Sequence, residues 1–462
     1  MFQLNDTIVA SATAMASSGI GIIRMSGEDA LNILYKIFHP KNENKDIREV
    51  ATHTIHYGYI FDGEDMIDEV LVMIMKAPHT YTGENTVEID CHGGIYAMQR
   101  VLDAAVKAGA RPAEPGEFSK RAFLNGKMDL SKAEAVMDLI HAGSSYALKS
   151  SLSQLSGSLE RKISEIREKL LHQVAYIESA LDDPEHYDIE GFGEELEVIV
   201  GEEKKKINHL IASFSEGKMI REGIKTVIIG KPNAGKSSLM NLLVGEKKAI
   251  VTDIAGTTRD ALEENINIGG VSLRIIDTAG IRDTQDVVEK IGVTMAREHA
   301  ADADLILYVV DSSIPLDKND REIMDMIRKS MKKTIILFNK TDLESKVDEE
   351  GLKAEMNLPV LQISAKTEEG LEELSKTIRS MFFKGEISFN DEVYITNIRH
   401  KKALDEAEKS LGLVEESIAN GMPEDFYSID LMGACDSLGS ITGENVGEDL
   451  VNEIFSKFCT GK

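Results

Sequence analysis

The chain of 462 residues is longer than one hydrophobic core usually supports, so two or three domains are expected. Its formal net charge of −27 argues against unaided coating of nucleic acid, because such binding depends on Lys and Arg neutralising phosphates. The apolar runs are far shorter than the ~20 residues that cross a bilayer, the first residues lack a secretory pattern, and three scattered cysteines fit neither a disulfide framework nor a zinc site. We therefore expect a cytoplasmic protein without a membrane span.

Residues 1–120 mix strand-like runs with one amphipathic helix pattern, which predicts an α+β domain. The strand-like runs cover residues 7–10, 19–25, 70–75 and 86–91, and the helix pattern covers 95–108.

Residues 121–217 are helical in pattern, with apolar residues at steps of three or four. The stripe consists of Leu148, Leu152, Leu155, Leu159, Ile163, Ile166, Leu170, Val174 and Ile177. We interpret it as the buried seam of one long bundle helix, with a dimer contact as the alternative. Helical patterns return at 399–419 and 428–441, so residues 382–462 are expected to complete this helical domain.

Between these halves, residues 218–381 alternate strand-like apolar runs with helices. Such alternation is typical of a mostly parallel sheet with helices on both faces. The predicted fold is therefore multidomain: an α+β N-terminal domain, an all-α helical domain and an inserted α/β domain of the P-loop GTPase type.

A phosphate-binding loop is predicted where residues 230–237 read G-K-P-N-A-G-K-S, which fits the pattern G-x-x-x-x-G-K-[ST] between a strand and a helix. Backbone N–H groups of such a loop surround phosphates at a helix N-terminus. Lys236 is expected to reach the β- and γ-phosphates and to act in catalysis, and Ser237 is expected to bind Mg²⁺.

Three further motifs follow strands in the order found in GTPases: D-T-A-G at 277–280, N-K-T-D at 339–342 and S-A-K at 364–366. Asp342 can accept hydrogen bonds from the N1–H and exocyclic amine of guanine, a donor pair that adenine lacks, so GTP is the predicted nucleotide. The predicted GTP-binding residues are Asn233, Ala234, Gly235, Lys236, Ser237, Ser238, Thr252, Asp253, Ile254, Ala255, Gly256, Thr257, Thr258, Asp277, Thr278, Ala279, Gly280, Asn339, Lys340, Asp342, Ser364, Ala365 and Lys366.

The hydrolytic machinery is expected to differ from that of Ras-like enzymes, because Ile281 stands where those enzymes orient water with Gln. Two polar features can replace that Gln, namely Asn233 in the phosphate loop and the segment 252–260. Thr258 is the second expected Mg²⁺ ligand. The alternative for Asn233 is a plain turn-forming role.

The chain resembles the tRNA-modifying GTPase family called MnmE or TrmE. The resemblance rests on G-K-P-N-A-G-K-S-S, I-V-T-D-I-A-G-T-T-R-D, D-T-A-G-I-R and V-E-K-I-G in the nucleotide-binding part. Outside that part it extends to residues 6–10, 19–27, 81–84, 92–94, 115–118, 121–125 and the C-terminal F-C-T-G-K, so it covers the whole chain.

The resemblance implies a potassium-stimulated GTPase in which Asn233, Thr252, Ile254 and Thr257 hold K⁺ and two GTPase domains meet face to face. It assigns the orientation of the attacking water to Glu289, which composition alone would place on a helix surface.

The resemblance further implies binding of 5-formyl- or 5,10-methylene-tetrahydrofolate by Arg24, Glu88, Lys127 and Lys462. Without it, Arg24 would be a surface salt bridge and Lys127 a solvated lysine. The family forms a homodimer through the N-terminal domain and a heterotetramer with an FAD-dependent partner. Together they modify carbon 5 of the wobble uridine of certain tRNAs. Cys459 is either a small filler or a reactive thiol.

Three alternative functions are considered, of which the sequence leaves the third unexcluded. The first is a regulatory or ribosome-assembly GTPase that acts as a switch without tRNA chemistry. The second is a GTPase domain coupled to ion transport, which the lack of apolar spans disfavours. The third is a folate-dependent one-carbon enzyme with a different acceptor.

Overall fold

The computed structural model describes residues 6–42, 46–183, 186, 191–245, 264–276, 300–367, 369–383 and 392–461. The chain divides into two compact units. Unit 1 comprises Met1–Met137, Glu160–Ser164 and Leu438–Lys462, and unit 2 comprises Asp138–Leu159 and Glu165–Ser437.

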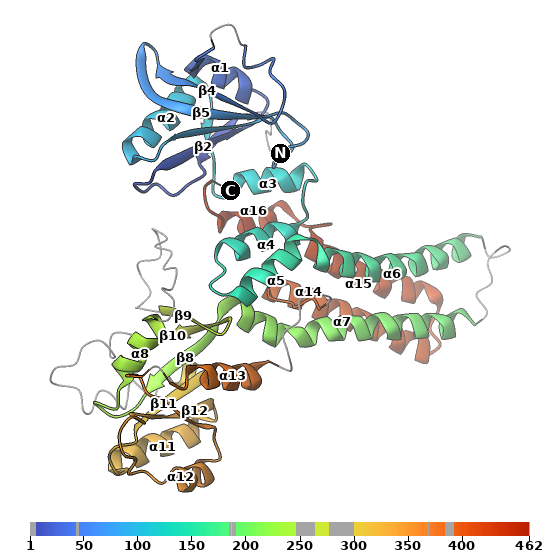
Figure 1. Cartoon of the computed structure of the whole chain (residues 1–462). Coiled ribbons are helices and arrows are strands. Elements are labelled where there is room, and N and C mark those ends of the chain that lie inside the picture. Colours follow the sequence, from blue (N-terminus) through green and yellow to red (C-terminus); the bar gives the residue numbers. More distant parts are fainter. Residues whose placement is uncertain are drawn as a thin grey trace. The chain divides into compact units, whose positions relative to one another are not determined.

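Unit 1 contains a seven-stranded sheet in the order β3-β4-β5-β6-β2-β1-β7 (Figure 1). Its elements are β1 (Ile8–Ser11), β2 (Ile20–Ser26), α1 (Ala30–Ile37), β3 (Phe38–Pro40), β4 (Thr54–Asp62), β5 (Asp65–Met75), β6 (Thr86–His92), α2 (Ile95–Ala108) and β7 (Arg111–Pro112). The predicted helix and the four predicted strands are present, which confirms the α+β class. β3, β4, β7 and α1 were not predicted.

The two faces of this sheet differ in burial. On one face, alternate residues such as Ile23, Val72 and Ile89 are fully buried. Their side chains share one core with residues of α1 and α2. The residues between them on β4 and β5 point to the opposite face, where Tyr57 pairs with Leu71 and both are exposed. One face of the sheet is therefore covered by helices, and the other carries exposed apolar side chains.

Unit 1 also joins the two ends of the sequence. Helices α3 (Glu117–Leu124), α4 (Leu130–Ile140) and α16 (Glu448–Ser456) are built around a shared aromatic core. Phe455 contacts both Phe123 and Phe458 in this core. Beyond α16, the backbone N–H of Gly116 donates to the carbonyl of Cys459 at 3.2 Å.

The helices of the all-α part are α5 (Ser145–Leu155), α6 (Ser158–Asp182), α7 (Phe192–Glu222), α14 (Ile398–Ala419) and α15 (Glu424–Thr442). The prediction of one continuous helix along the apolar stripe was wrong. Gly157, with φ of 84°, separates α5 from α6. From Leu159 to Ile177 the stripe is buried, whereas Leu148 and Leu152 are 43% and 47% exposed.

Unit 2 contains a six-stranded sheet in the order β13-β12-β11-β8-β10-β9. Every pairing is parallel except that of β9 with β10, which confirms the prediction of a mostly parallel sheet. Its elements are β8 (Ile224–Ile229), α8 (Lys236–Gly245), β9 (Glu264–Ile268), β10 (Val271–Ile275), β11 (Leu305–Asp311), α11 (Lys318–Ser330), β12 (Lys333–Asn339), α12 (Glu349–Met356), β13 (Val360–Gln362) and α13 (Leu371–Phe382).

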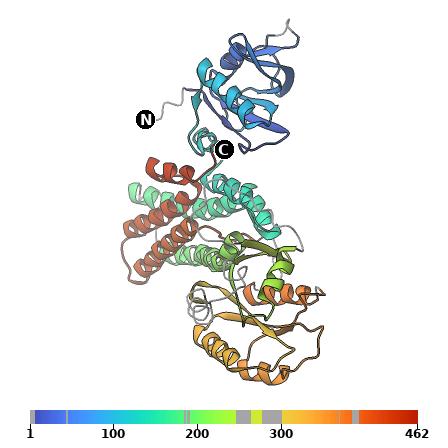
Figure 2. The same ribbon diagram turned by 90° about the vertical axis from the view of Figure 1, so that its left-hand side faces the viewer.

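Helices cover both faces of this sheet, as predicted (Figures 1 and 2). One core joins Leu307 of β11 to Leu239 of α8 and Leu374 of α13. The other joins Tyr308 of β11 to residues of α11 and α12. Successive side chains of β11 pack alternately into the two cores, so every residue of the strand is buried.

The chain enters the sheet of unit 2 from α7 and leaves it through residues 392–397 into α14. The exit segment is fixed by side chains of two helices. The amide of Gln154 on α5 donates to the carbonyl of Tyr394 and the hydroxyl of Thr396, both at 3.2 Å. On α7, the hydroxyl of Ser213 accepts from the N–H of Ile395 at 3.0 Å.

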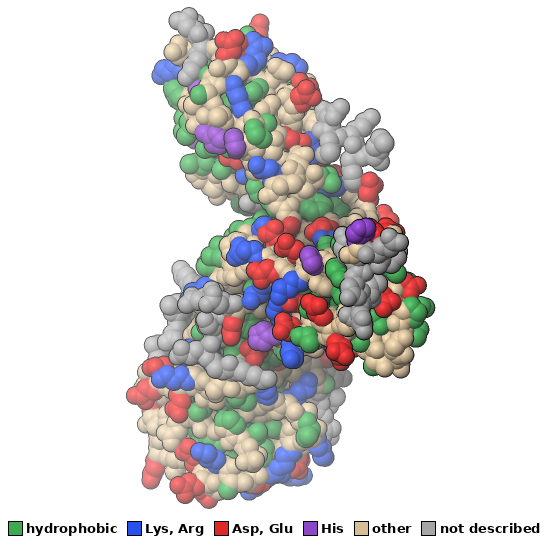
Figure 3. Space-filling model, turned by 90° about the vertical axis from the view of Figure 1, so that its right-hand side faces the viewer, with side chains coloured by type: hydrophobic (Ala, Val, Ile, Leu, Met, Phe, Trp, Pro, Cys, Tyr) green, Lys and Arg blue, Asp and Glu red, His purple; other side chains and the backbone are tan. Residues whose placement is uncertain are grey.

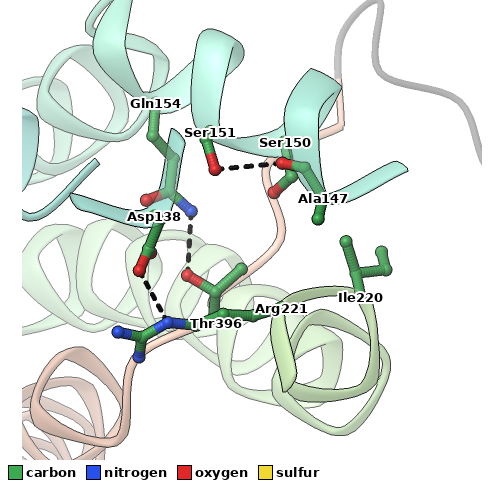
Figure 4. A pocket seen from close by; sticks show the side chains of 8 residues that line it. All are labelled: Asp138, Ala147, Ser150, Ser151, Gln154, Ile220, Arg221 and Thr396. Atoms are coloured by element: carbon green, nitrogen blue, oxygen red, sulfur yellow. Dashed lines mark hydrogen bonds and ion pairs between the residues drawn. The ribbon is translucent and has the colours of Figure 1, made fainter. Parts of the chain in front are cut away.

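Gln154 and Thr396 also line a small pocket (Figure 4). Its lining residues are Asp138, Ala147, Ser150, Ser151, Gln154, Ile220, Arg221 and Thr396. The pocket holds about 10 Å³, about enough for one water. It is therefore a packing feature rather than a nucleotide site.

Within the described ranges, none of the helices combines the length and apolar character that a bilayer crossing requires. On the face shown in Figure 3, acidic and basic side chains are mixed, with blue groups interrupted by red ones.

Candidate nucleotide-binding site

The phosphate loop lies between β8 and α8, as the sequence predicts. Its backbone passes through three residues with positive φ: Gly230 at 157°, Asn233 at 64° and Gly235 at 98°. A Cβ on Gly230 would come within 2.4 Å of the Val309 carbonyl oxygen. Glycine is therefore required at position 230 for both backbone conformation and space.

Lys236 begins α8 and turns back over the loop. Its Nζ donates to the carbonyls of Gly230 and Lys231, each at 2.8 Å. Burial lowers the pKa of this amine. Ser237 follows in the first turn of α8 and is half-buried, whereas Ser238 and Asn233 are exposed.

The base-recognition motif begins at the end of β12 and contacts the phosphate loop directly. The amide of Asn339 donates to the carbonyl of Ala234 at 2.9 Å, and its oxygen accepts from the N–H of Ala365 at 3.2 Å. Lys340, with φ of 66°, forms an ion pair with Asp311 at 2.5 Å. The structure thus brings the phosphate loop together with the N-K-T-D and S-A-K motifs.

Asp342 lies beside the S-A-K motif. Its Oδ1 accepts from the hydroxyl of Ser364 at 3.3 Å, and its Oδ2 lies 3.8 Å from Nζ of Lys366. Ser364 also accepts from the N–H of Thr367 at 3.2 Å. These contacts hold a carboxylate at the position that the sequence assigns to guanine.

Several predicted site residues lie outside the described part of the chain. They are residues 252–258, which carry the predicted K⁺ and second Mg²⁺ ligands, residues 277–280, Glu289 and Lys462. Within the described part, no group of three or more His, Cys, Asp or Glu side chains is arranged to hold a metal ion.

The predicted folate residues Arg24 and Glu88 are register partners on β2 and β6. Arg24 Nε donates to Glu88 Oε1 at 2.7 Å, and its Nη1 donates to the carbonyl of Gly461 at 3.1 Å. The Arg24 guanidinium also lies 5.8 Å from the ring centroid of Phe118. Arg24 therefore does form a salt bridge, and this salt bridge faces the C-terminal tail.

Lys127 donates to the carbonyl of Pro78 at 2.9 Å. Cys459 is exposed. Its backbone carbonyl holds the tail to Gly116, so the described contact of Cys459 with unit 1 is through its main chain.

Sequence reasoning missed three ion pairs of this site. Asp311 ends β11 and holds Lys340, a role that its position at the end of a buried strand could have suggested. Lys231 pairs with Asp317 and Asp320 of the α11 N-terminus. It occupies a variable position of the loop pattern, so no motif marks it.

The mostly parallel sheet, the phosphate loop before α8 and the base-side motifs define this part of the chain as a P-loop GTPase fold. Two family profiles match the chain. One is described as the MnmE helical domain and matches residues 130–459, and the other as the GTP-binding protein TrmE N-terminus and matches residues 7–127. The chain belongs to the MnmE family, also called TrmE.

Curated relatives match over nearly their full length. The tRNA modification GTPase MnmE of Lachnoclostridium phytofermentans is 54% identical over 457 residues, covering 99% of both chains. That of Thermoanaerobacter pseudethanolicus is 49% identical over 460 residues, again covering 99% of both chains. Among solved structures, the G domain of the FeoB iron transporter of T. maritima is 28% identical, with a TM-score of 0.27, and covers 34% of this chain and 97% of that chain.

Proposed function

We propose that this protein hydrolyses GTP to GDP and phosphate and couples this reaction to the modification of the wobble uridine of certain tRNAs. The observation that carries the proposal is the hydrogen bond from Asn339 to Ala234, which joins a base-recognition motif to a phosphate loop. The name shared by the two relatives described above, tRNA modification GTPase MnmE, supports the coupling to tRNA.

The described residues divide the recognition of GTP between the two ends of the site. Amides of residues 233–238 at the start of α8 suit phosphate oxygens, since a helix N-terminus favours anions. Lys236 supplies positive charge for the β- and γ-phosphates, and its position at the start of α8 suits this role. Asp342 accepts from the two guanine donors.

Two cations belong to the proposal. Mg²⁺ would be held by Ser237 and Thr258, and the position of Ser237 in the first turn of α8 suits a ligand beside the phosphates. K⁺ would be held by Asn233, Thr252, Ile254 and Thr257. Asn233 fits this role because its oxygen-bearing side chain is exposed on the loop. Glu289 would orient the attacking water, and Lys236 is the second residue proposed to act in catalysis.

In the N-terminal domain, we assign 5-formyl- or 5,10-methylene-tetrahydrofolate to Arg24, Glu88, Lys127 and Lys462. When bound, this folate supplies the one-carbon unit for carbon 5 of the uridine. Arg24 and Lys127 suit the carboxylates of folate and Glu88 suits its ring donors. Because Arg24 and Glu88 hold each other at 2.7 Å, folate has to compete with this ion pair.

The exposed face of the N-terminal sheet supports the proposed homodimer. Ile55 and Leu71 are 60% and 45% exposed there, and a cluster of exposed apolar side chains marks an interaction surface. We further propose a heterotetramer with an FAD-dependent partner in the cytoplasm. The partner contributes much of the tRNA-binding surface, because this chain is strongly acidic.

We also propose a division of these functions among four segments. Residues 1–120 serve dimerisation and folate binding, 121–217 and 382–462 form the helical domain, and 218–381 bind GTP. Cys459 is a candidate reactive thiol near the folate end because its side chain is exposed.

The deciding experiment compares GTP hydrolysis in KCl and NaCl at equal ionic strength for the wild type, Asn233→Ala and Asn233→Gly. Since Asn233 has φ of 64°, the alanine variant also strains the loop, whereas the glycine variant removes only the side chain. Rapid turnover only in KCl, lost in both variants, supports the proposal. Equal wild-type rates in both salts contradict K⁺ stimulation and favour a switch GTPase.

Coupling to tRNA is tested separately, by analysing wobble uridine after deletion of the gene. Loss of the carbon-5 modification supports it. Unchanged uridine, with folate present in the purified protein, would instead favour a one-carbon enzyme with another acceptor.

A further inference from the structure

Lys231, the second residue of the phosphate loop, reaches two aspartates at the start of α11, of which Asp320 is buried and Asp317 is 54% exposed. Its side chain is only 8% exposed. Its Nζ lies 2.6 Å from Oδ2 of Asp320 and 2.9 Å from Oδ2 of Asp317. Both aspartates belong to the N-terminus of α11, where they form a capping box. A long flexible side chain of the loop is thus anchored to a helix.

Asp320 is held from several sides. Its Oδ1 accepts from the hydroxyl of Tyr308 on β11 at 3.1 Å, and its Oδ2 accepts from the N–H of Asp317 at 2.9 Å. Asp320 is 1% exposed. A carboxylate at this depth needs a cationic partner, because burying an unpaired charge is strongly unfavourable. Lys231 is the described residue that supplies this charge.

The backbone of Lys231 serves the opposite side of the loop. Its carbonyl accepts from Nζ of Lys236 at 2.8 Å and from the N–H of Ala234 at 3.3 Å. Lys231 therefore connects the buried Asp320 to Lys236, the lysine proposed to bind the phosphates. A displacement of Lys231 would displace the support of Lys236.

We propose that Lys231 is a positioning residue for nucleotide binding: its pairing with Asp317 and Asp320 fixes the start of the phosphate loop, so that Lys236 and the loop amides are aligned before the triphosphate arrives. This inference rests on the proposed GTP function. Alignment of this kind strengthens binding by reducing the ordering that the ligand has to impose. Lys231 acts through geometry, since its own charge is directed at carboxylates.

The experiment uses the full chain and four variants. Lys231→Met removes the anchor, and Lys231→Arg retains it. Lys231→Met with Asp320→Asn removes both charges and so avoids an unpaired buried carboxylate. Lys318→Met is the matched control, because Lys318 lies on the same helix with its side chain 89% exposed. For each we measure the dissociation constant of fluorescent GDP in KCl, kcat and KM for GTP, and the thermal midpoint.

We expect Lys231→Met to raise the GDP dissociation constant and KM about tenfold, with kcat within about twofold of the wild type. Lys231→Arg and Lys318→Met should bind like the wild type. The double variant should recover the thermal midpoint but not the affinity, a split that a purely structural role would not produce.

Wild-type affinity in the double variant would overturn the inference, because the anchor would then be dispensable for binding. Failure of the wild type itself to bind GDP would instead overturn the proposed function. The two failures are therefore distinguishable within one set of measurements.

Discussion

The amide of Asn339 donates to the main-chain carbonyl of Ala234 at 2.9 Å, with both residues almost completely buried. The same side chain accepts from the N–H of Ala365. Three loops that are far apart in sequence therefore meet on one side chain. This contact also explains Gly235, because a Cβ there would lie 2.0 Å from the Asn339 nitrogen. The phosphate loop is therefore joined directly to the N-K-T-D and S-A-K motifs.

Base specificity should follow the carboxylate of Asp342. In Asp342→Asn the amide NH₂ would face the guanine amine, donor against donor, so we expect GTP affinity to fall about a hundredfold. Xanthine carries a carbonyl in place of that amine, so XTP should become the better substrate. Competition binding and hydrolysis assays with both nucleotides test this. An unchanged preference for GTP would show that Asp342 does not contact the base.

The C-terminal tail should control the proposed folate site through Gly461. A Cβ at this position would lie 2.3 Å from the Ser11 carbonyl oxygen, so Gly461→Ala has to displace the tail and its contact with Arg24. We expect folate affinity to fall about tenfold, equivalent to ~1.4 kcal/mol, with GTP hydrolysis unchanged. Gly447→Ala is the matched control, because nothing lies within 4 Å of its Cβ position. Equal folate affinity in both variants, measured by calorimetry, would contradict a role for the tail.

The junction between α5 and the segment before α14 should depend on Gln154. This side chain is 3% exposed, and Gln154→Ala leaves the buried hydroxyl of Thr396 without its described donor. We expect the free energy of unfolding to fall by about 1–3 kcal/mol. A double-mutant cycle with Thr396→Val, in which urea denaturation gives the stability of each variant, isolates the interaction between Gln154 and Thr396. Strictly additive effects would show that the two side chains are not coupled.

Acid stability should depend on Glu117 in unit 1. Burial by itself would raise the pKa of Glu117, but hydrogen bonds from Arg111, the Glu114 amide and Arg121 outweigh it and lower the pKa. A carboxyl with a lowered pKa in the folded state stabilises the fold above its unfolded value of about 4.3, and this stabilisation is lost as pH falls through the folded value.

Glu117→Gln should therefore be less stable at pH 7 and should lose less further stability below about pH 4. Urea midpoints across this pH range, compared with the wild type, provide the measurement. Parallel curves for the two proteins would show that Glu117 does not carry the effect.

The elements that the sequence predicted correctly are those whose apolar pattern coincides with burial, such as β2, β6 and α2. β4 lacks this signal, because the residues on its buried face include His56 and Gly58. Gly58 is small for a reason that only the fold reveals: a Cβ there would lie 2.3 Å from the His39 carbonyl oxygen. β9 also lacks this signal, because it is an edge strand and only one of its five residues is buried.

The helix break at Gly157 and the anchor at Lys231 could not be predicted for different reasons. Leu155 and Leu159 keep helical spacing across Gly157, so the pattern continues where the helix does not. Lys231 and Asp320 meet because α11 begins beside the phosphate loop, a fact of tertiary structure that no local pattern carries. The phosphate loop and the N-K-T-D and S-A-K motifs could be expected near one another because each follows a parallel strand, and the carboxyl ends of parallel strands lie at the same edge of a sheet.

Unit 1 contains residues from before Met137 and after Leu438, with Phe455 in its aromatic core and Gly461 bound to Arg24. During translation this core cannot be completed until α16 has left the ribosome, whereas the sheet of unit 2 is available much earlier. The entropy of closing a loop grows only logarithmically with its length, so joining two segments so far apart in sequence costs little more than joining nearer ones. In a nascent chain, the sheet of unit 2 can therefore form before the N-terminal and C-terminal segments of unit 1 are joined.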